Sequence, residues 1–562
     1  MKVQKTSDLG PGNQSRRGFA RLLWRLADLV QAAERRRSFR AKAYRQAVWS
    51  LDDLAADLEV SDEQLLATPG IGPGVAALVR EYRTTGHINQ LVSLEEAYPR
   101  ETPRLRRLPR MTPKMLHDLK SGLGVESRAD LLEAIDAGAA GTLRGVGEQT
   151  IELWRKILEL APSPEHIPAH EAWVVARSLA DHIARHTDCW VDLAGDVRRV
   201  EEWVDRVDLV AVTDDPGHLE DFIATTAVLD DIVETNDDLI RARTHTGVPV
   251  AVHHAVPEEA GTRLIEATGP AEHAASVTKD PFPTEHEAYG SVGLVFVPAP
   301  ARGLAVERAG GVVAVEELRG DLHLHSNLSP DGRMTLETIL TIARDRAYEY
   351  VLITDHTQGL RFGGLGPEEI MAQATMIQNL RPHFPDITVF HGAELNIGPD
   401  GLLDLPEEAL STLDFAVAGV HSHFQLDGTA QTERVLAALG HTVVRVLAHP
   451  FGRRIGTRPA LDIDMDAIID AAISNAVALE TNGHRDRLDL PAEWVGIAAT
   501  KGAKLAANSD AHRTDEMGNV ANAVATLQRA GVTATQVVNA LDVAGIARWV
   551  ARGRATGGEG GI

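Results

Sequence analysis

Residues 320–333 read GDLHLHSNLSPDGR, an apolar run that ends in His323 and His325 and leads to Asp331. Later runs have the same character: EYVLITDH (349–356), ITVFHGAE (387–394), FAVAGVHSH (415–423), VRVLAHP (444–450), VALETNG (477–483) and LAANSDAH (505–512). Amphipathic stretches separate them, and this alternation is typical of βα units and a parallel sheet. Because the carboxyl ends of the strands converge on one face of an α/β barrel, we expect the polar residues at these ends to form one site.

The histidines and carboxylates at these strand ends have the chemistry of metal ligands. A His-x-His pair at the end of a strand places both imidazoles on one face, where they can chelate one ion. A single such histidine would be better explained as a surface or core residue. The whole set predicts a polynuclear metal centre, and its mixed imidazole and carboxylate ligands suit manganese, zinc or iron better than magnesium alone.

Length and composition set the broad class of the protein. The chain has 562 residues, of which 44% are hydrophobic and 24% charged, so we expect several globular domains. No run approaches the roughly 18 apolar residues of a membrane span. The polar N-terminus and the single cysteine, Cys189, favour a cytoplasmic protein without a secretory signal or disulfide framework. We also expect a monomer.

The charge is distributed unevenly along the chain. The net charge of -24 argues against a uniformly DNA-binding surface, because DNA is a polyanion. Residues 1–160, however, contain 25 Lys and Arg against 21 Asp and Glu, a net charge of +4 that leaves -28 for the rest. The sequence therefore predicts that any nucleic-acid contact lies in the N-terminal part.

That N-terminal part, residues 16–160, has apolar residues at helical spacing and glycine-rich turns. TPGIGPGV (68–75) contains Gly70, Gly72 and Gly74 and precedes an apolar helix-like stretch, so its amides can face a phosphate. A weaker copy is MTPKMLHDLKSGLGV (111–125), and a third is LRGVGEQTIELW (143–154), with Gly145 and Gly147. A single such turn is more often a helix cap. Their repetition in a net-positive block favours sequence-independent binding of the DNA backbone.

Taken together, these segments resemble bacterial family X DNA polymerases that carry a C-terminal PHP (polymerase and histidinol phosphatase) domain. The N-terminal similarity lies in RSFRAKAYRQA (37–47), TPGIGPG and RTTGHI (83–88), and the middle similarity in AGDVRRVEEWVDRVDLV (194–210). The resemblance implies a multidomain protein: an all-α helix-hairpin-helix region at 16–160, an α/β nucleotidyltransferase-like palm and thumb at 165–312, and a distorted (β/α)7 PHP barrel at 320–550. Residues 1–15 and 551–562 would be flexible tails.

The resemblance also implies a ligand set for up to three divalent ions. The first ion would be held by His323, His325, Glu394 and Asp510, the second by the bridging Glu394 with His421 and His449, and the third by Asp331, His356 and His512. The reaction that the resemblance implies is hydrolysis of a phosphate ester by metal-activated water, with Glu394, Asp510 and Arg453 in catalytic roles. Arg453, Arg454 and Arg487 could hold phosphate oxygens, although surface salt bridges are an equal alternative.

The palm departs from the family pattern. Counting from Arg198 and Arg199 puts Arg206 at the first metal-binding Asp position and Asp208 at the second, while Ala251 stands at the third. Asp196 replaces the serine that contacts nucleotide phosphates. A register that pairs Asp205 with Asp208 is disfavoured, because residues three apart on a strand point to opposite faces. Lyase chemistry is also not expected, because Leu78 and Gly74 stand where lyase-active members carry lysines.

The preferred interpretation is a DNA-binding, metal-dependent phosphodiesterase, a manganese-dependent 3′ to 5′ exonuclease in DNA repair with an inactive polymerase centre. The alternatives are an active family X polymerase, a small-molecule phosphoesterase resembling histidinol phosphatase, and a non-catalytic repair scaffold. Intact metal ligands weigh against the scaffold, and the DNA-binding block weighs against the small-molecule enzyme.

Overall fold

The computed structural model describes residues 15–34, 38–54, 57–163, 165–236, 238–304, 311–360 and 363–556. The chain divides into two compact units, each described separately below. Unit 1 comprises residues 1–197, 203–268 and 277–288, and unit 2 comprises residues 198–202, 269–276 and 289–562. The expected palm and thumb region, 165–312, is therefore divided, because residues 289–312 pack with the C-terminal part. The predicted tails at 1–14 and 557–562 lie outside the described residues.

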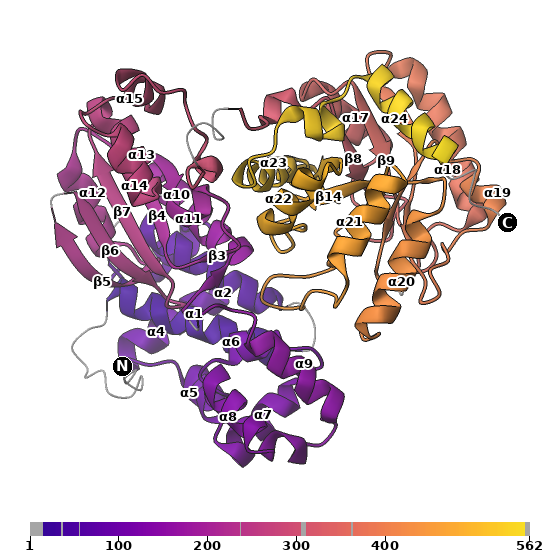
Figure 1. Ribbon diagram of the computed structural model, residues 1–562. Helices are drawn as coiled ribbons and strands as arrows, with labels where there is room; N and C mark the ends of the chain where they lie inside the picture. The colour runs from indigo at the N-terminus through magenta and orange to yellow at the C-terminus, as the bar shows by residue number, and fades with distance from the viewer. Residues whose placement is uncertain are drawn as a thin grey trace. The chain divides into compact units, whose positions relative to one another are not determined.

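The sheet of unit 1 has the strand order β2-β4-β7-β6-β5, in which β4 and β7 are parallel and the other neighbours antiparallel. Figure 1 shows β7, β6 and β5 side by side. The strands are β1 Ile167–Pro168, β2 Trp190–Ala194, β3 Trp203–Val204, β4 Val207–Val212, β5 Leu229–Asn236, β6 Leu239–Thr244 and β7 Pro249–Ala255. The helices of this region are α10 Ala169–Thr187, α11 Gly195–Arg198, α12 Pro216–Thr225, α13 Ala260–Thr268, α14 Ala271–Val277 and α15 Glu285–Ser291.

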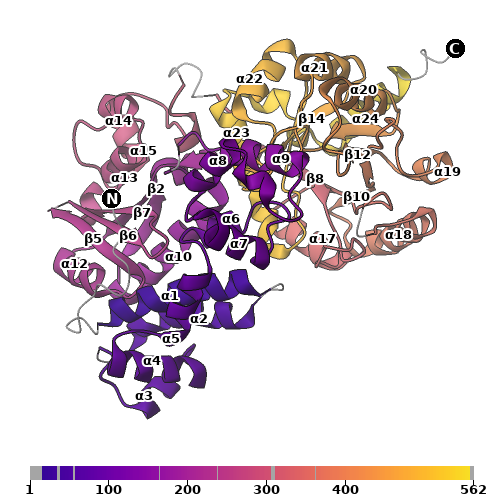
Figure 2. The same ribbon diagram turned by 90° about the horizontal axis from the view of Figure 1, so that it is seen from below.

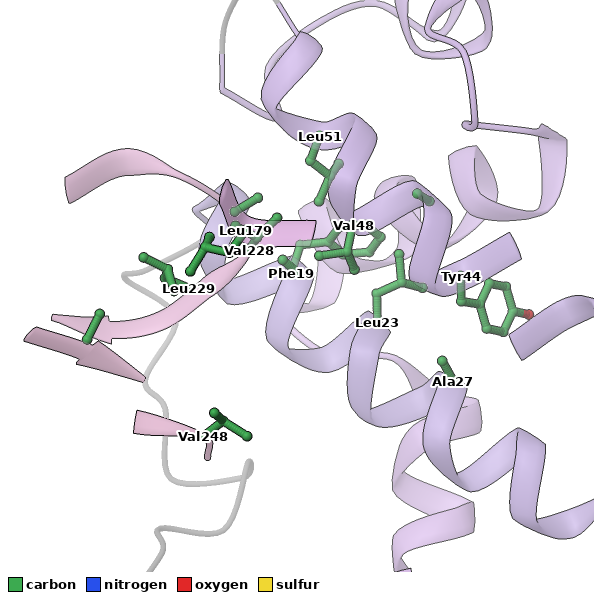
Figure 3. Close-up of a cluster of buried hydrophobic side chains, with 14 of the residues drawn as sticks. Phe19, Leu23, Ala27, Tyr44, Val48, Leu51, Leu179, Val228, Leu229 and Val248 are labelled. Carbon is green, nitrogen blue, oxygen red and sulfur yellow. The ribbon is translucent and has the colours of Figure 1, made fainter. Parts of the chain in front are cut away.

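The first N-terminal helices share one core with this sheet. Ser15 caps α1, and the apolar face of that helix buries Phe19, Leu23 and Ala27. Figure 3 shows these residues close to Val48, and Val228 beyond them. The helical region was predicted as a domain of its own, but here its first half shares a hydrophobic core with the sheet, because buried residues of α1 and α2 pack in the same cluster as those of α10, β4 and β5.

Two further hairpins pack around a separate core. The N-terminal helices are α1 Arg16–Ala33, α2 Phe39–Ser50, α3 Asp62–Ala67, α4 Pro73–Thr85, α5 Asn89–Ala97, α6 Thr102–Leu105, α7 Pro113–Leu123, α8 Arg128–Asp136 and α9 Glu148–Leu158. Leu108, Leu116, Val146 and the fully buried Trp154 lie in the core of the second and third hairpins. The indole of Trp154 donates to the carbonyl of Pro109 over 2.8 Å and so links one hairpin to the other.

Unit 2 is built from parallel strands with helices outside them (Figures 1 and 2). The strands are β8 Gly320–Leu324, β9 Tyr350–Ile353, β10 Thr388–His391, β11 Glu394–Asn396, β12 Ala416–Gly419, β13 Val444–Leu447, β14 Ala478–Asn482 and β15 Leu505–Asn508. The helices are α17 Leu336–Asp345, α18 Pro367–Leu380, α19 Glu407–Leu410, α20 Gly428–Leu439, α21 Met465–Ser474, α22 Ala492–Lys501, α23 Val520–Arg529 and α24 Val543–Thr556. Helix α24 thus continues into the expected C-terminal tail.

The parallel strands form two sheets, β10-β9-β8 and β11-β12-β13-β14-β15. Strands β10 and β11 are consecutive in the chain and link the two sheets at Gly392 and Ala393. At the other seam, the amide of His325 donates to the carbonyl of Ala511 over 2.9 Å, and that of Leu322 donates to the side chain of Asn508. The strand ends are thereby gathered around a common axis.

No helix among the described residues is both long and apolar enough to cross a membrane.

Candidate metal centre

The carboxylate of Glu394, the first residue of β11, lies at the centre of a cluster of histidines. Its Oε1 is 3.0 Å from Nε2 of His421 and 2.9 Å from Nε2 of His449. Its Oε2 is 3.4 Å from Nε2 of His323 and 3.6 Å from Nε2 of His325. Nδ1 of His356 is also 2.8 Å from Oε2, so the two oxygens face different sets of imidazoles, as a carboxylate that bridged two ions would.

A second carboxylate, Asp510 after β15, completes one end of the cluster. Its Oδ1 is 3.5 Å from Nε2 of His323 and 3.3 Å from Nε2 of His325. All three residues are buried, and their ligand atoms lie within 4.8 Å of one another. The residues of the expected first ion thus come together at the ends of β8, β11 and β15.

The residues of the expected third ion form an adjacent, more open group. Oδ2 of Asp331 is 3.4 Å from Nε2 of His512 and 3.7 Å from Nε2 of His356. Nδ1 of His356 also approaches Oε2 of Glu394 at 2.8 Å, so this histidine lies between the groups. The ring of His325 stacks on that of His512 at a centroid distance of 4.1 Å.

The donor set fits divalent ions. Several ligand atoms are buried and have no hydrogen-bond partner within the part of the chain that the structure describes: Nε2 of His323, Nε2 of His325, Nδ1 of His356, Nε2 of His421 and Oε2 of Glu394. Leaving so many polar atoms buried and unsatisfied is costly, unless a cation accepts their lone pairs. Ligand atoms from six histidines and three carboxylates are therefore compatible with divalent metal binding at this end of the strands.

Glu480 in β14 orients one of these ligands. The sequence singled it out as a strand-end carboxylate without assigning it a role. Its Oε1 is 2.7 Å from Nδ1 of His323, and its Oε2 accepts from the amide of His449 over 2.7 Å. When Nδ1 of His323 donates its proton to Glu480, the lone pair of Nε2 faces the cluster, and such outer partners tune metal ligands. The feature that could have revealed this role is a charged side chain within a strand that is buried along its whole length, since such a charge needs a partner.

The charges of the cluster are strongly coupled. Burial opposes the charge of His323, but Glu480, Asp510 and Glu394 outweigh it and raise the pKa of His323 well above its usual range. Burial likewise opposes the charge of Glu394, and His421, His356 and His323 overcome it and hold its pKa well below the usual value. The negative charge that would attract cations is thus maintained despite complete burial.

The backbone at the site adopts conformations that are rare elsewhere. His449 has φ of 29° and Asp510 has φ of 54°, both in the left-handed region, which non-glycine residues seldom adopt. Gly419 at the end of β12 is required for space, because a Cβ there would come within 2.9 Å of His449, 3.0 Å of His421 and 3.1 Å of Glu394. The backbone at these three positions is therefore shaped by the need to bring the His, Glu and Asp side chains together.

Two of the predicted phosphate-binding arginines are engaged by the protein. Arg453 donates to both carboxylate oxygens of Glu202, over 2.8 and 2.7 Å, and to the carbonyls of Arg487 and Leu488. Arg454 donates to Asp486 over 2.6 Å. The guanidinium of Arg487 is buried, with Nε 3.5 Å from Oδ2 of Asp510 and Nη1 without a hydrogen-bond partner among the described residues. The geometry favours Arg487 over Arg453 for contact with a phosphate.

In the palm region, the structure places Arg206, Asp208 and Ala251 together. Asp208 on β4 is the direct neighbour of Ala251 on the parallel strand β7, and Ala251 is fully buried. Oδ1 of Asp208 accepts from Nε of Arg206 over 2.9 Å and lies 3.1 Å from Nε2 of His253. Asp196 lies in α11, immediately after Gly195, which contacts Asp208.

The three glycine-rich turns share one geometry. In each, an amide donates over 3.1 Å to a carbonyl three residues earlier: Ile71 to Thr68, Met111 to Leu108 and Val146 to Leu143. The residue before each donor has a positive φ, 89° for Gly70, 62° for Arg110 and 85° for Gly145. The second turn is thus centred on 108–112, at the start of the expected segment. Arg110 stands where the other two turns have a glycine, so the second turn was harder to recognise from the sequence.

The predicted DNA-binding glycines occupy the helix starts of these turns. Gly72 is the N-cap of α4, Gly74 lies in its first turn, and Gly147 is the N-cap of α9. No atom lies within 4 Å of where a Cβ would stand at any of the three, so the backbone is accessible there.

Comparison with known proteins agrees with this architecture. A helix-hairpin-helix domain family matches residues 15–88. The DNA polymerase/3′-5′ exonuclease PolX of Bacillus subtilis is 28% identical over 536 residues, which cover 89% of this chain and 93% of that protein. A probable phosphatase of Syntrophotalea carbinolica is 26% identical over 231 residues, 39% of this chain and 90% of its own length. The probable phosphatase YcdX of Escherichia coli is 25% identical over 232 residues, 39% and 89% of the two chains.

The fold and the site define a multidomain protein in which a helix-hairpin-helix region and an α/β sheet are joined to a unit with a cluster of potential metal ligands. More particularly, the chain resembles the bacterial family X DNA polymerases that carry a C-terminal PHP domain.

Proposed function

We propose that this protein is a DNA-binding, divalent-metal-dependent phosphodiesterase that acts as a 3′ to 5′ exonuclease and does not polymerise DNA. The observation that carries the proposal is the convergence on Glu394 of buried imidazoles whose nitrogens lack other partners. The exonuclease named in the Bacillus subtilis relative supports the same reaction. Manganese is the metal we expect, because the ligands mix imidazole and carboxylate.

The unit that holds this site is proposed to be a PHP barrel of the distorted (β/α)7 kind. Counting β10 and β11 as one interrupted strand gives the parallel order β8, β9, β10/β11, β12, β13, β14, β15, with the seam between β15 and β8 made largely by side chains. The expected ligands then lie near or after strand carboxyl ends, apart from Glu394, which begins β11 and so lies inside the interrupted strand.

The residues of the site have separable roles in such a reaction. Bound divalent ions would activate water and neutralise charge on the phosphate. Glu394 and Asp510 hold opposing faces of the imidazole cluster in place, and Glu480 fixes the tautomer of His323. Arg487 presents a buried, unpaired Nη1 that can donate a charge-assisted hydrogen bond to a phosphate oxygen of the substrate.

The palm region is proposed to be inactive in nucleotidyl transfer. Two divalent ions close together need several carboxylates to compensate their mutual repulsion. Here Asp208 is the single carboxylate of the expected three, and it is already paired with the guanidinium of Arg206. The helix-hairpin-helix turns would hold the DNA backbone, since their amides and helix starts are accessible.

A second candidate function is hydrolysis of small phosphoesters, favoured by the relatives named as probable phosphatases. The two candidates are separated by assaying the purified full-length protein with Mn²⁺ on end-labelled single-stranded DNA and on p-nitrophenyl phosphate. The exonuclease proposal expects shortening of the DNA from its 3′ end, abolished by chelator. Hydrolysis of p-nitrophenyl phosphate with no degradation of DNA would support the phosphatase instead.

A further inference from the structure

A short hairpin follows directly after the metal-ligand candidate His449. Within RRIGTR (453–458), the amide of Arg454 donates to the carbonyl of Arg458 over 2.9 Å, and the amide of Arg458 donates back over 2.8 Å. Gly456 forms the turn with φ of 75°, a conformation that suits glycine. The hairpin therefore presents Arg454 and Arg458 as direct neighbours at the border of the site.

The guanidinium of Arg458 is held on an aromatic ring. Its central carbon lies 4.3 Å from the centre of the Phe424 ring, within the range of a cation–π contact. Phe424 follows the ligand candidate His421 by three residues. The backbone at Gly452 packs against the same ring, since a Cβ at Gly452 would lie 3.3 Å from Phe424 Cε1. The ring thus fixes the position of the guanidinium and connects it to the metal cluster.

The positive charge of Arg458 is poorly compensated. Burial, together with the charges of Arg487 and Arg454, lowers the pKa of Arg458 to about 9, although Asp486 and Asp489 act in the opposite direction. Nε of Arg458 is buried, and no described residue forms a hydrogen bond with it. Of the two acidic neighbours, Asp486 already pairs with Arg454 and His484, and Oδ1 of Asp489 accepts from the amide of Phe451. An anion placed beside Arg458 would relieve both the excess charge and the unsatisfied donor.

The Arg458 site is connected to the reacting centre by Arg487. Arg487 approaches Asp510 at 3.5 Å, and its charge lowers the pKa of both His449 and Arg458. Two cationic groups are therefore associated with the cluster: Arg487 beside the ligand candidate Asp510, and Arg458 on the ring of Phe424, which packs against Gly452 shortly after His449. A nucleic-acid strand carries one phosphate per nucleotide, so a second phosphate follows the one that is cleaved.

We propose that Arg458, held on Phe424, binds the phosphodiester next to the one being cleaved and so selects oligonucleotides over substrates with a single phosphate. This inference rests on the proposed phosphodiesterase function and names its substrate class. Arg458 would be a substrate-binding residue, whereas Phe424 would be a positioning residue that acts through Arg458.

The test measures kcat/KM of the full-length protein with Mn²⁺ on three substrates: a short single-stranded oligodeoxynucleotide, the p-nitrophenyl ester of thymidine 5′-phosphate, and bis(p-nitrophenyl) phosphate. Only the first carries a second phosphate. Arg458→Ala is expected to lower kcat/KM on the oligonucleotide by roughly 10- to 100-fold, the loss of one hydrogen bond to a charged group. Activity on the other two should stay within about twofold, which also shows that the variant is folded.

Matched variants refine the result. Arg458→Lys should keep part of the oligonucleotide activity, and Phe424→Leu should lower it to an intermediate level. Arg319→Ala removes the same charge from the opposite end of β8 and should change nothing, since Arg319 is half-exposed and pairs with Glu349.

Equal losses on all three substrates, no loss on any, or a loss shared by the thymidine ester would overturn the inference. Failure of the unaltered protein to hydrolyse any substrate would instead overturn the proposed function itself.

Discussion

Nε of Arg206 donates a hydrogen bond to Oδ1 of Asp208 over 2.9 Å, within the segment that resembles the metal-binding motif of a polymerase palm. The guanidinium of Arg206 therefore neutralises the charge that this carboxylate could offer to a metal ion. The neighbouring residue across the sheet, Ala251, offers no ligand. This pair is the basis of our proposal that the sheet does not support nucleotidyl transfer.

The first prediction follows from this pair. Primer extension with dNTPs and Mg²⁺ or Mn²⁺ should show no template-directed incorporation by the unaltered protein, because Arg206 repels the ions and Ala251 cannot bind them. The double variant Arg206→Asp with Ala251→Asp is expected to remain inactive, because Asp196 still places like charge near the triphosphate. Template-dependent extension that is lost in Asp208→Ala would show that the palm is active.

The second prediction concerns the bridging carboxylate. Glu394→Ala should abolish Mn²⁺-dependent hydrolysis and reduce the bound metal content measured by mass spectrometry, because Glu394 faces two pairs of imidazoles. Asp208→Ala is the matched carboxylate control from the palm region and should leave hydrolysis unchanged. Full activity in Glu394→Ala would exclude this cluster as the hydrolytic site.

The third prediction tests the orienting role of Glu480. Glu480→Gln keeps the shape of the side chain but removes the charge that faces Nδ1 of His323. Loss of such an outer partner typically costs about 10- to 100-fold in metal affinity or activity, and we expect that range in Mn²⁺ titrations. Glu407→Gln, on the exposed helix α19, should behave as the unaltered protein does. An unchanged Mn²⁺ titration in Glu480→Gln would remove Glu480 from the site.

The fourth prediction is thermodynamic. A saturating ion that binds only the folded state stabilises it by about 2.7 kcal/mol at one hundred times its dissociation constant, or roughly 5 to 10 °C in Tm for a domain of this size. Calorimetry should show Mn²⁺ raising the Tm of one transition in the unaltered protein, with no such rise in Glu394→Ala. If Mn²⁺ shifts both proteins equally, its stabilising site lies elsewhere.

The fifth prediction concerns DNA binding by the hairpins. Gly72→Glu or Gly147→Glu should weaken duplex binding by about tenfold at low salt, because a carboxylate would stand at a helix N-terminus that faces phosphate. Both positions have open space for a side chain, as does Gly122 in α7, so Gly122→Glu is a control with equal charge. Fluorescence anisotropy over a salt series measures the effect, and equal weakening by all three variants would point to a general charge effect.

The DNA-binding measurement requires the full-length protein, because a fragment of residues 1–160 would lack part of its hydrophobic core. Phe19 and Val48 lie in the same core as Leu179 and Val228 of the palm region (Figure 3). Cutting the chain at residue 160 would therefore expose a large apolar surface.

Much of the candidate site could be predicted from the sequence alone. Strand-like runs that each end in His, Asp or Glu indicated a site at the carboxyl ends of parallel strands, because that geometry is a property of βα units. Residues such as His323, His325, Glu394 and Asp510 could be named because their chemistry is local and their spacing is visible. The departures at Arg206 and Ala251, by contrast, could be recognised only against the motif of the family that the sequence resembles.

Only the tertiary structure decided which of these groups are available. Arg453, Arg454 and Arg487 look alike in sequence, yet the first two donate to Glu202 and Asp486, while Nη1 of Arg487 is buried without a partner. The roles of Glu480 and Arg458 likewise depend on contacts with His323 and Phe424, which lie far away along the chain. Sequence spacing determines which residues lie at the same strand end. Contacts between distant segments depend on how the whole chain packs, and this packing decides which charged side chains are already paired within the protein and which can bind a ligand.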